Sequence, residues 1–466
     1  MTGHQTLTSE VTFMRRPIRI KHEIEKLASH SGLIHIGALL DAINFKYRFK
    51  TINGVHCVAP TISHADILSS MIALMSVGKP DYDAIEIFRQ KQDFFNKALG
   101  IRTCPSSPTL RQRIDLIGSR ADMAIKDAGA DLVRSCAPAI SPIRTSAGDF
   151  LPLDMDVSPF DNSKTQKEGV SRTYKGVDGF APIFAYLGTE GYLVNLEFRE
   201  GKQHCQKNTP EFINDTLDYV RKITDQPVLM RLDSGNDSQD NFPDNSRSNV
   251  HFIIKRNLRR ESPQRWVDLA KKTGEQQHSR PGKRLWIGKT FVDINGDPLP
   301  YPIIFEVTER QTQKGQTLLF PEYQIDTYWC SLEPLPPAEV IGLYHDHGTS
   351  EQFHSELKSD MSLERLPSGH FSSNSLILHL AMLTYNMLRV IGQISLEESD
   401  PNELPGIRKK KVSRRRIRTV MQDLMYMAGR LVSRGRQWYL SFGQLNPFSG
   451  LMERIYIRLN LLPATK

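Results

Sequence analysis

Five short apolar segments between residues 150 and 254 constrain the fold more than any other feature of the sequence. Each is rich in aliphatic, aromatic or β-branched residues, as strands are, and they cover residues 150–156, 180–187, 192–198, 227–232 and 250–254. A Gly-Thr-Glu-Gly turn joins the second segment to the third. A helix is predicted after the third segment, with Thr209 as its N-cap and Pro210 at its first position. Three strands, a helix and two further strands predict a mixed α/β sheet.

Two of these segments end in carboxylates. The first ends with Asp154 and Asp156, and the fourth is followed by Asp233 and, four residues later, by Asp237. Open α/β sheets place functional sites beyond the carboxyl ends of their strands, where a carboxylate is held rigidly while it faces solvent or a metal. Aspartate and serine also end strands for purely local reasons. Each cluster taken alone is therefore compatible with both interpretations.

The segment 344–358, which reads YHDHGTSEQFHSELK, combines a helix start with several chemically active side chains. Thr349 and Gln352 form a capping-box pattern, which predicts that a helix begins there. Glu351 would then lie in the first turn, where a carboxylate suits the positive end of the helix dipole. Lys358 follows two turns later on the same face of the helix.

Tyr344 and His347 precede this predicted helix, so one helix entry presents a phenol, an imidazole, a carboxylate and an ammonium group. The spacing Tyr344-x2-His347-x3-Glu351-x6-Lys358 resembles the Y-x2-R-x3-E-x6-K signature of bacterial insertion-sequence DDE transposases of the cut-and-paste type. His347 stands where that signature has arginine. A histidine can donate to a phosphate, but without the permanently charged, bidentate fork of arginine.

Two earlier motifs agree with this resemblance. Asp156-Val-Ser158 resembles the D-x-S/T motif of the first strand in that family, and Arg231-Leu-Asp233-Ser-Gly resembles its second-aspartate motif. The stretches YKGVDGFAPIFAYLGTEGYLVNLEFREG and FIIKRNLRR are also typical of it. Three motifs in this order are more specific than any one of them, and the resemblance covers roughly residues 60 to 460.

The resemblance implies an α/β fold: an RNase H-like mixed sheet core with a β-rich insertion, a helical region before it and a helical region after it. The predicted boundaries are 1–145 for a helical N-terminal DNA-binding region, 146–260 and 336–400 for the catalytic core, 261–335 for the insertion, and 401–466 for a basic helical C-terminal region. Residues 234–249 depart from the pattern, because the fold implies a helix there and the sequence is almost wholly polar.

The resemblance also implies which carboxylates are catalytic: Asp156, Asp233 and Glu351, which would be the metal ligands. Hydrolysis of a phosphodiester puts charge on the attacking and leaving oxygens, and two cations about 3.5–4 Å apart can stabilise both. Two Mg²⁺ or Mn²⁺ ions are expected, because these cations prefer carboxylate oxygens. Asp154 remains a rival for the first position and Asp237 for the second.

Basic residues provide the predicted contacts with DNA phosphates. By the resemblance, Tyr344, His347 and Lys358 would contact phosphates of the transposon end. The chain carries 60 Lys and Arg against 52 Asp and Glu, a net charge of +8, and one stretch accounts for the whole excess. Its eight basic residues, also predicted to bind phosphates, are Arg408, Lys409, Lys410, Lys411, Arg414, Arg415, Arg416 and Arg418. A basic run can equally form a solvated face.

The predicted function is that of a DNA transposase, which binds the terminal inverted repeats of its element and joins them to target DNA. Such an enzyme would act on double-stranded DNA as a homodimer in a synaptic complex, and a hairpin intermediate is implied only by analogy. The alternatives are a two-metal DNA nuclease without strand transfer and a transposase-derived DNA-binding protein that does not cut. The scattered cysteines and the lack of a long apolar stretch favour a cytoplasmic, nucleoid-associated protein without membrane contact.

Two apolar features admit a structural or a functional interpretation. Tyr328 and Trp329 could stack on a DNA base, or they could form an ordinary aromatic pair in a β-sheet core. Residues 372–390 form an apolar helix, which we interpret as core packing.

Overall fold

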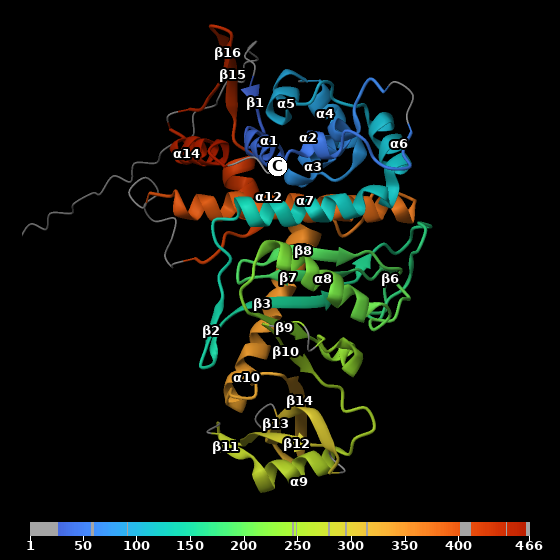
Figure 1. Cartoon of the computed structure of the whole chain (residues 1–466), viewed down its shortest axis with the longest axis vertical. Coiled ribbons are helices and arrows are strands. Elements are labelled where there is room, and N and C mark those ends of the chain that lie inside the picture. The colour runs from blue at the N-terminus through green and yellow to red at the C-terminus, as the bar shows by residue number, and fades with distance from the viewer. Residues whose placement is uncertain are drawn as a thin grey trace, which may run out of the picture.

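The computed structural model describes residues 27–56, 60–90, 92–244, 247, 249–277, 280–293, 296–313, 316–400, 412–443 and 445–462. The predictions for Arg408, Lys409, Lys410 and Lys411 therefore lie outside the described residues. Figure 1 shows an elongated molecule, with helices and a small hairpin at one end, a sheet in the middle and long strands at the other end.

The middle of the molecule is a five-stranded mixed sheet whose order is β8-β7-β3-β9-β10. The strands are β3 (Gly148–Val157), β7 (Ile183–Leu187), β8 (Tyr192–Glu197), β9 (Val228–Leu232) and β10 (Val250–Lys255). β7 runs antiparallel to β3 and β8, whereas β3, β9 and β10 are mutually parallel. This order, 3-2-1-4-5 along the chain, is that of an RNase H-like core. The five predicted strands and the fold class are therefore confirmed.

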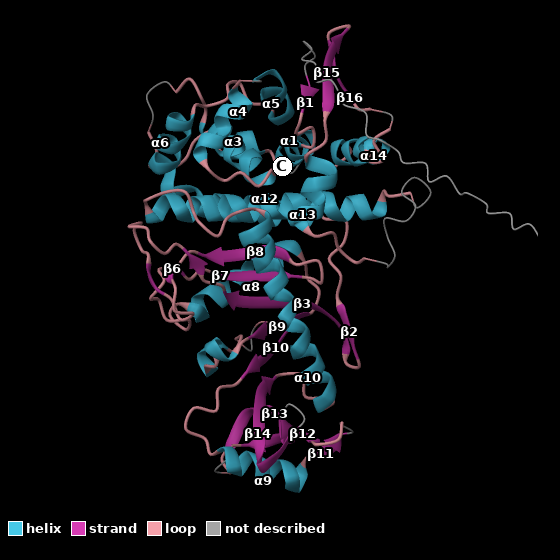
Figure 2. Cartoon of the chain, turned by 180° about the vertical axis from the view of Figure 1, so that it is seen from behind, coloured by secondary structure: helices cyan, strands magenta, loops and turns pink. Residues whose placement is uncertain are grey.

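The predicted insertion is β-rich and continues the central sheet. Three long strands form an antiparallel meander: β12 (Lys283–Val292), β13 (Pro298–Gln313) and β14 (Gln316–Cys330). β14 pairs with β10, so the meander extends the core sheet at its β10 edge. A short strand, β11 (Glu275–Gln277), pairs with β12, and the helix α9 (Pro263–Thr273) packs beside the meander. Figure 2 shows this sheet from behind.

Helices cover both faces of the sheet. On one face, α8 (Thr209–Ile223) buries apolar side chains against β3, β7 and β9, and α9 packs against the meander. On the other face, α10 (Pro337–His345) contributes Val340, Ile341 and Leu343 to a second cluster. The central strands are buried on both sides, which explains why their sequences are continuous apolar runs instead of alternating ones.

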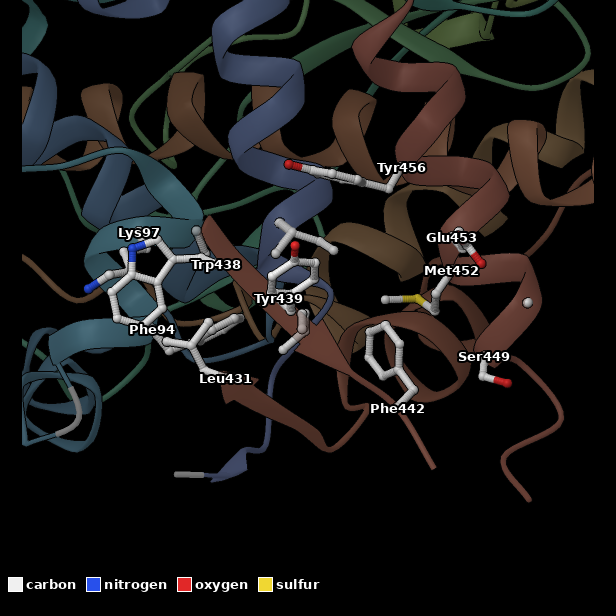
Figure 3. A pocket seen from close by; sticks show the side chains of 14 residues that line it. Phe94, Lys97, Leu431, Trp438, Tyr439, Phe442, Ser449, Met452, Glu453 and Tyr456 are labelled. Atoms are coloured by element: carbon white, nitrogen blue, oxygen red, sulfur yellow. The ribbon is translucent and has the colours of Figure 1, made fainter. Parts of the chain in front are cut away.

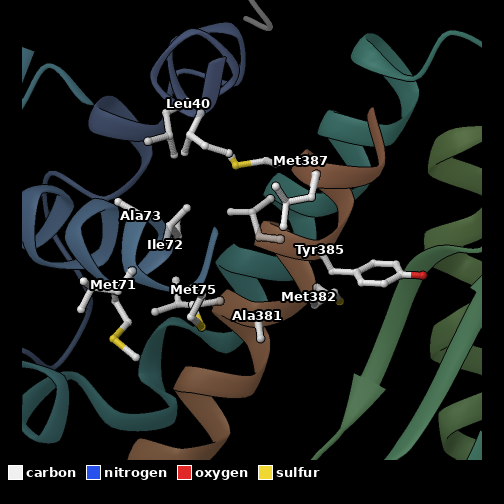
Figure 4. Packing of buried hydrophobic residues seen from close by; sticks show 14 of the residues in the cluster. Leu40, Met71, Ile72, Ala73, Met75, Ala381, Met382, Tyr385 and Met387 are labelled. Carbon is white, nitrogen blue, oxygen red and sulfur yellow. The ribbon is translucent and has the colours of Figure 1, made fainter. Parts of the chain in front are cut away.

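The long helix α12 (Phe371–Glu397) organises the helical end of the molecule. It packs against α3 (His64–Ser76) and α7 (Asp122–Cys136), and Figure 4 shows Met71, Met75, Ala381 and Met382 in that contact. Each fully buried leucine or isoleucine there contributes roughly 1.5–3 kcal/mol to stability. Among the described residues, α12 is the one helix long and apolar enough to cross a membrane. Its whole apolar stretch is buried inside the protein, which confirms the interpretation as core packing.

The remaining helices share the same core as α12. In the N-terminal region they are α1 (Leu33–Ala42), α2 (Phe45–Arg48), α4 (Ile85–Arg89), α5 (Gln92–Leu99) and α6 (Ser107–Ile117). The C-terminal α13 (Ile417–Val420) and α14 (Ser449–Asn460) bury residues in the same hydrophobic cluster. The N-terminal and C-terminal helices that the structure describes thus share one hydrophobic core with α12.

The C-terminal segment differs from the predicted helix after residue 425. A π-helical turn, Met421–Met425, follows α13, but residues 429–441 form a hairpin of β15 (Gly429–Arg434) and β16 (Gln437–Ser441). The two residues that join these strands, Gly435 and Arg436, have φ values of 56° and 64°. Two successive positive φ values produce the tight turn that suits a two-residue hairpin, and this turn breaks the helical pattern.

Three local predictions need correction. The predicted helix start at Thr349 is wrong, because the chain is already helical from Pro337 and stays helical, with 3₁₀ and π turns, to Asp360. The N-cap of α8 is Asn208 instead of Thr209, so Thr209 and Pro210 both lie inside the helix. In place of a helix after β9, residues 234–236 and 239–241 form two short 3₁₀ turns.

Candidate active site

Asp156 and Asp233 lie side by side at the carboxyl ends of neighbouring parallel strands. Met155 of β3 pairs with Leu232 of β9, so the residues that follow them, Asp156 and Asp233, are adjacent. Burial and the negative charge of Asp156 raise the pKa of Asp233 above its ordinary value. Asn236 Nδ2 donates a hydrogen bond of 2.7 Å to Asp233 Oδ1. The sheet therefore holds two carboxylates close enough to repel each other.

Gly235 leaves room for the Asp233 carboxylate. A Cβ atom at position 235 would lie 3.3 Å from Asp233 Oδ1 and 3.4 Å from Oδ2, tighter than ordinary van der Waals contact. The Cys205 thiol, which lies beside this turn, donates a 2.9 Å hydrogen bond to the Gly235 carbonyl. Glycine at the third position of the Asp-Ser-Gly sequence after β9 thus avoids a tight contact with the Asp233 carboxylate.

Glu351 approaches these aspartates from the helix α11 (Ser350–Ser355), where its side chain is exposed. Three residues later on the same helix, His354 Nε2 lies 3.4 Å from Asp156 Oδ2. Tyr174 joins the group, because burial and then the charges of Asp156, Asp233 and, more weakly, Glu351 raise the pKa of its hydroxyl. Asp156 and Asp233 therefore lie together, with Glu351 on the helix beside them, and we call these three carboxylates the acidic site.

The two rival aspartates are engaged elsewhere in the fold. Asp154 is buried and accepts hydrogen bonds of 2.6 and 2.8 Å from Arg231, and its Oδ1 lies 2.9 Å from His347 Nδ1. Burial raises the pKa of Asp154, but the charges of Arg231 and His347 outweigh this effect and lower it. We call Asp154, Arg231 and His347 the buried ion cluster.

Asp237 is also occupied by internal partners. Its Oδ1 accepts a 3.1 Å hydrogen bond from Trp329 Nε1, and its Oδ2 accepts one of 2.9 Å from the backbone N–H of Asn257. Trp329 and Tyr328 are 4 % and 1 % exposed. Of their two interpretations, the pair therefore fits the aromatic β-core, and Asp156 and Asp233 are favoured over their rivals.

The basic and phenolic residues of the predicted signature surround the acidic site, with unforeseen partners. His347 is buried, and Asp154 raises its pKa above the ordinary value although burial alone lowers it. Lys358 Nζ donates to the carbonyl of Pro159 and lies 5.0 Å from the centre of the Phe160 ring. The Tyr344 ring packs against Tyr328 at 4.8 Å, and burial together with Asp233 and Asp156 raises its pKa.

The described part of the basic run forms internal ion pairs. Arg414 donates to Glu356 at 2.7 Å and to Gln352 at 2.8 Å, and Arg416 donates to Asp360 at 2.8 Å. Arg418 also pairs with Asp360, at 3.2 Å, and Arg415 lies 3.8 Å from Asp423. Glu356 and Asp360 follow Glu351 in the same helical segment. These arginines thus hold the segment that carries Glu351, while their predicted phosphate contacts stay predictions.

The sequence predicted neither the role of Tyr174 in the site nor the buried position of His354, for which a surface or phosphate-facing role was expected. Tyr174 donates a 3.0 Å hydrogen bond to the carbonyl of Val157, the residue after Asp156. The spacing of His354 could have predicted its place in the site, because it lies three positions after Glu351 and residues at this spacing are neighbours on a helix. Tyr174 had no such signal, because a loop residue reaches the site only through the tertiary fold.

The residues of the acidic site suit a divalent cation. Asp156 and Asp233 supply oxygen ligands that repel each other, and a cation between them would relieve that repulsion. In the part of the chain that the structure describes, no three His, Cys, Asp or Glu side chains yet converge on one metal position. Glu351, which is exposed, would have to turn toward the two aspartates to complete a set of three ligands.

A cavity elsewhere in the molecule contains none of the predicted site residues. It has a volume of about 610 Å³ and lies among α1, α5, α14 and the β15–β16 hairpin. Figure 3 shows Phe94, Trp438 and Phe442 around it, and Lys97 Nζ lies 4.1 Å from the centre of the Trp438 ring. The chemistry of the acidic site, and not the size of a cavity, therefore identifies the candidate active site.

Comparisons with known proteins identify the family of the chain. A family model described as "Transposase DDE domain group 1" matches residues 11–464, nearly the whole chain. Among curated proteins, none matches the chain. A solved structure similar to this chain is the piggyBac transposase synaptic complex with hairpin DNA, determined by cryo-electron microscopy. It is 11% identical, has a TM-score of 0.40, and the match covers 94% of this chain and 83% of that chain.

Proposed function

This chain belongs to the group 1 DDE transposase family and is a DNA-cleaving and strand-transferring enzyme, and we propose that Asp156, Asp233 and Glu351 form its catalytic site. The observation that carries the proposal is the register of β3 and β9, which sets Asp156 beside Asp233. The helix that carries Glu351 reaches the same strand end through His354. Asp154 and Asp237 have other partners, which supports the choice among the four aspartates.

Enzymes of this family use divalent metal ions, and we propose that two Mg²⁺ or Mn²⁺ ions bind the acidic site. Such ions stabilise charge on the attacking and leaving oxygens of a phosphodiester. Asp156 and Asp233 would hold the metal between neighbouring strand ends, and Glu351 would complete the ligand set from the helix. Lys358, Tyr344 and His347 border the site and would orient the phosphates of the DNA strand.

The DNA partner follows from the same reaction. We propose that the enzyme binds the terminal inverted repeats of its own element, cuts them and joins the freed ends to target DNA. Two ends must then be held together, which a homodimer in a synaptic complex would accomplish. A protein with this role would act in the cytoplasm, at the nucleoid. A nuclease without strand transfer would share the acidic site, so the products of the reaction must distinguish the two.

A cleavage and joining assay tests the proposal. The substrate is linear DNA that carries the inverted repeats flanking the gene, incubated with the protein, Mg²⁺ and a supercoiled target plasmid. We expect double-strand cuts at the repeat ends and joined products, both abolished by Glu351→Ala while binding of the ends persists. Cleavage without any joined product would favour the nuclease. Normal cleavage by the Glu351→Ala variant would contradict the proposed site.

A further inference from the structure

His354 lies between the acidic site and a buried tyrosine. Its side chain is only 6% exposed and sits on α11, three residues after Glu351. On one side, Nδ1 lies 3.2 Å from the hydroxyl of Tyr186. On the other side, Nε2 lies 3.4 Å from Asp156 Oδ2 and has no hydrogen-bond partner at normal distance. The imidazole thus connects a phenol on β7 with a carboxylate on β3.

The sheet itself sets up this arrangement. In the antiparallel pair of β3 and β7, Asp156 lies opposite Phe184, and Asp154 lies opposite Tyr186. The rings of Phe184 and Tyr186 both lie 5.3 Å from the His354 ring. Two neighbouring aromatic side chains on one strand therefore fix the plane of the imidazole, and the adjacent strand presents the carboxylate.

The count of donors and acceptors indicates which nitrogen carries the proton. An imidazole nitrogen that accepts a hydrogen bond carries no proton, so a bond accepted at Nδ1 of His354 leaves the ring proton on Nε2. The buried hydroxyl of Tyr186 has no other hydrogen-bond partner among the described residues, so it must donate to Nδ1 to be satisfied. The single proton of the ring then lies on Nε2, directed at Asp156. The opposite tautomer would leave the Tyr186 proton buried without an acceptor.

We propose that His354 is a positioning residue for Asp156, with the Tyr186 hydroxyl fixing its tautomer and its Nε2–H holding Asp156 Oδ2. The inference rests on the proposed catalytic role of Asp156. In metal sites, a hydrogen bond to a ligating carboxylate orients it, and its loss typically costs 10–100-fold in metal affinity or activity. The distance of 3.4 Å is long for such a bond, as is common in an active site before its substrate is bound.

The position of His354 also couples the two halves of the acidic site. Glu351 and His354 lie on the same turn of α11, so a bond from His354 to β3 fixes the distance between the helix and the strand that carries Asp156. Arg414 supports the outer side of the same segment through Gln352 and Glu356. Loss of the His354 contact should therefore weaken metal binding and leave the DNA-binding surface unchanged.

The test is the Mg²⁺ dependence of end cleavage by the full-length protein. His354→Leu removes both nitrogens, and His354→Gln retains a donor close to the position of Nε2. We expect His354→Leu to raise the Mg²⁺ concentration for half-maximal cleavage by about 10–100-fold, with metal-free binding of end DNA unchanged. His354→Gln should recover most of that shift. An unchanged Mg²⁺ requirement in His354→Leu would overturn the proposal.

A second pair of variants keeps the test valid if His354→Leu does not fold. Tyr186→Phe removes the hydroxyl that fixes the tautomer, and we expect a several-fold increase in the Mg²⁺ requirement. Tyr192→Phe is the matched control, because the Tyr192 hydroxyl is buried on the neighbouring strand without a hydrogen-bond partner. An equal Mg²⁺ requirement for cleavage in Tyr186→Phe and Tyr192→Phe would contradict the proposal. Normal cleavage by Asp156→Ala would instead contradict the proposed catalytic site, and the role proposed for His354 would fail with it.

Discussion

Asp154 and Asp156 lie two positions apart on β3, on the same side of the sheet, yet their surroundings are opposite. Asp154 is enclosed by Arg231 and His347, which compensate its charge. Asp156 has a second carboxylate, Asp233, at the neighbouring strand end, and His354 Nε2 lies 3.4 Å from its Oδ2. One aspartate is therefore part of the framework, whereas the other lies beside a carboxylate that repels it.

The contrast between Asp154 and Asp156 shows how an ion pair inside a sheet can fix the position of a carboxylate at the strand end. The buried ion cluster joins β3, β9 and the end of α10, because Arg231 also donates a 2.6 Å hydrogen bond to the Leu343 carbonyl. Two residues further along each strand, the same pair of strands presents Asp156 and Asp233. The compensated pair thus fixes the strand register that the uncompensated pair needs. Each prediction below alters one side of this comparison.

The largest effect is expected for Asp156→Ala. Loss of a ligand for cations that stabilise the transition state by several kcal/mol should reduce cleavage about a thousandfold or more. Stability should change little, because removal of Asp156 also relieves its repulsion with Asp233. Cleavage rates on end DNA and urea unfolding are the measurements. Wild-type cleavage by Asp156→Ala would show that Asp156 is not a metal ligand, and the contrast with Asp154 would fail.

The opposite pattern is expected for Asp154→Ala. Removal of one partner of a buried ion pair leaves Arg231 uncompensated and should cost about 3–5 kcal/mol of unfolding free energy. Asp154→Leu combined with Arg231→Met removes both charges and should recover part of that loss. Urea unfolding of the two variants checks this. Equal stability of Asp154→Ala and the wild type would show that Asp154 does not hold the framework.

The pH dependence of that loss has a defined sign. The pKa of Asp154 is lower in the folded protein than its ordinary value of 3.8. A lowered carboxyl pKa contributes stability that is present above pH 3.8 and disappears as the pH falls through the folded value. Because Asp154 also raises the pKa of His347, the stability difference between wild type and Asp154→Ala should be largest between the two pKa values. It should shrink in acid, and also as the pH rises through the pKa of His347. A difference independent of pH down to acid unfolding would contradict this explanation.

A smaller effect is expected at Asp360, a second compensated carboxylate. Its side chain is fully buried and is held by Arg416 and Arg418, which are half-exposed. The double variant Arg416→Gln, Arg418→Gln should lose about 1–3 kcal/mol, the cost of a poorly satisfied buried acceptor. If these arginines act only inside the fold, the salt dependence of DNA binding stays as in the wild type. A flatter salt dependence would restore their predicted role in phosphate binding.

The smallest effect, with the opposite sign, is expected for Asp233→Asn. Burial and Asp156 raise the pKa of Asp233 in the folded protein, so its charge disfavours folding once the pH exceeds the ordinary value of 3.8. Without metal at neutral pH, Asp233→Asn should therefore unfold at a slightly higher temperature than the wild type. The gain should vanish in acid, and added Mg²⁺ should stabilise only the wild type. Thermal unfolding with and without Mg²⁺ checks both points.

The sequence predicted the sheet and the adjacent positions of Asp156 and Asp233 because local patterns determine them. Apolar runs define buried strands, and the residues after β3 and β9 meet wherever those strands pair. The helix start at Thr349 was wrong because a capping-box pattern also occurs inside a helix, and Pro337 at the true start gave a weaker signal. The sequence could not predict that His347 pairs with Asp154 or that Arg414 pairs with Glu356, because these residues meet only through tertiary packing.

The central claim is that Asp156, Asp233 and Glu351 bind the metal ions whereas Asp154 does not. Electron paramagnetic resonance of Mn²⁺, titrated into the protein bound to end DNA, tests it directly. The account predicts about two bound Mn²⁺ ions per active site in the wild type, and loss of bound ions in Asp156→Ala, Asp233→Ala and Glu351→Ala. It predicts retention in the Asp154→Leu, Arg231→Met double variant. Wild-type Mn²⁺ binding by all three alanine variants would contradict the account.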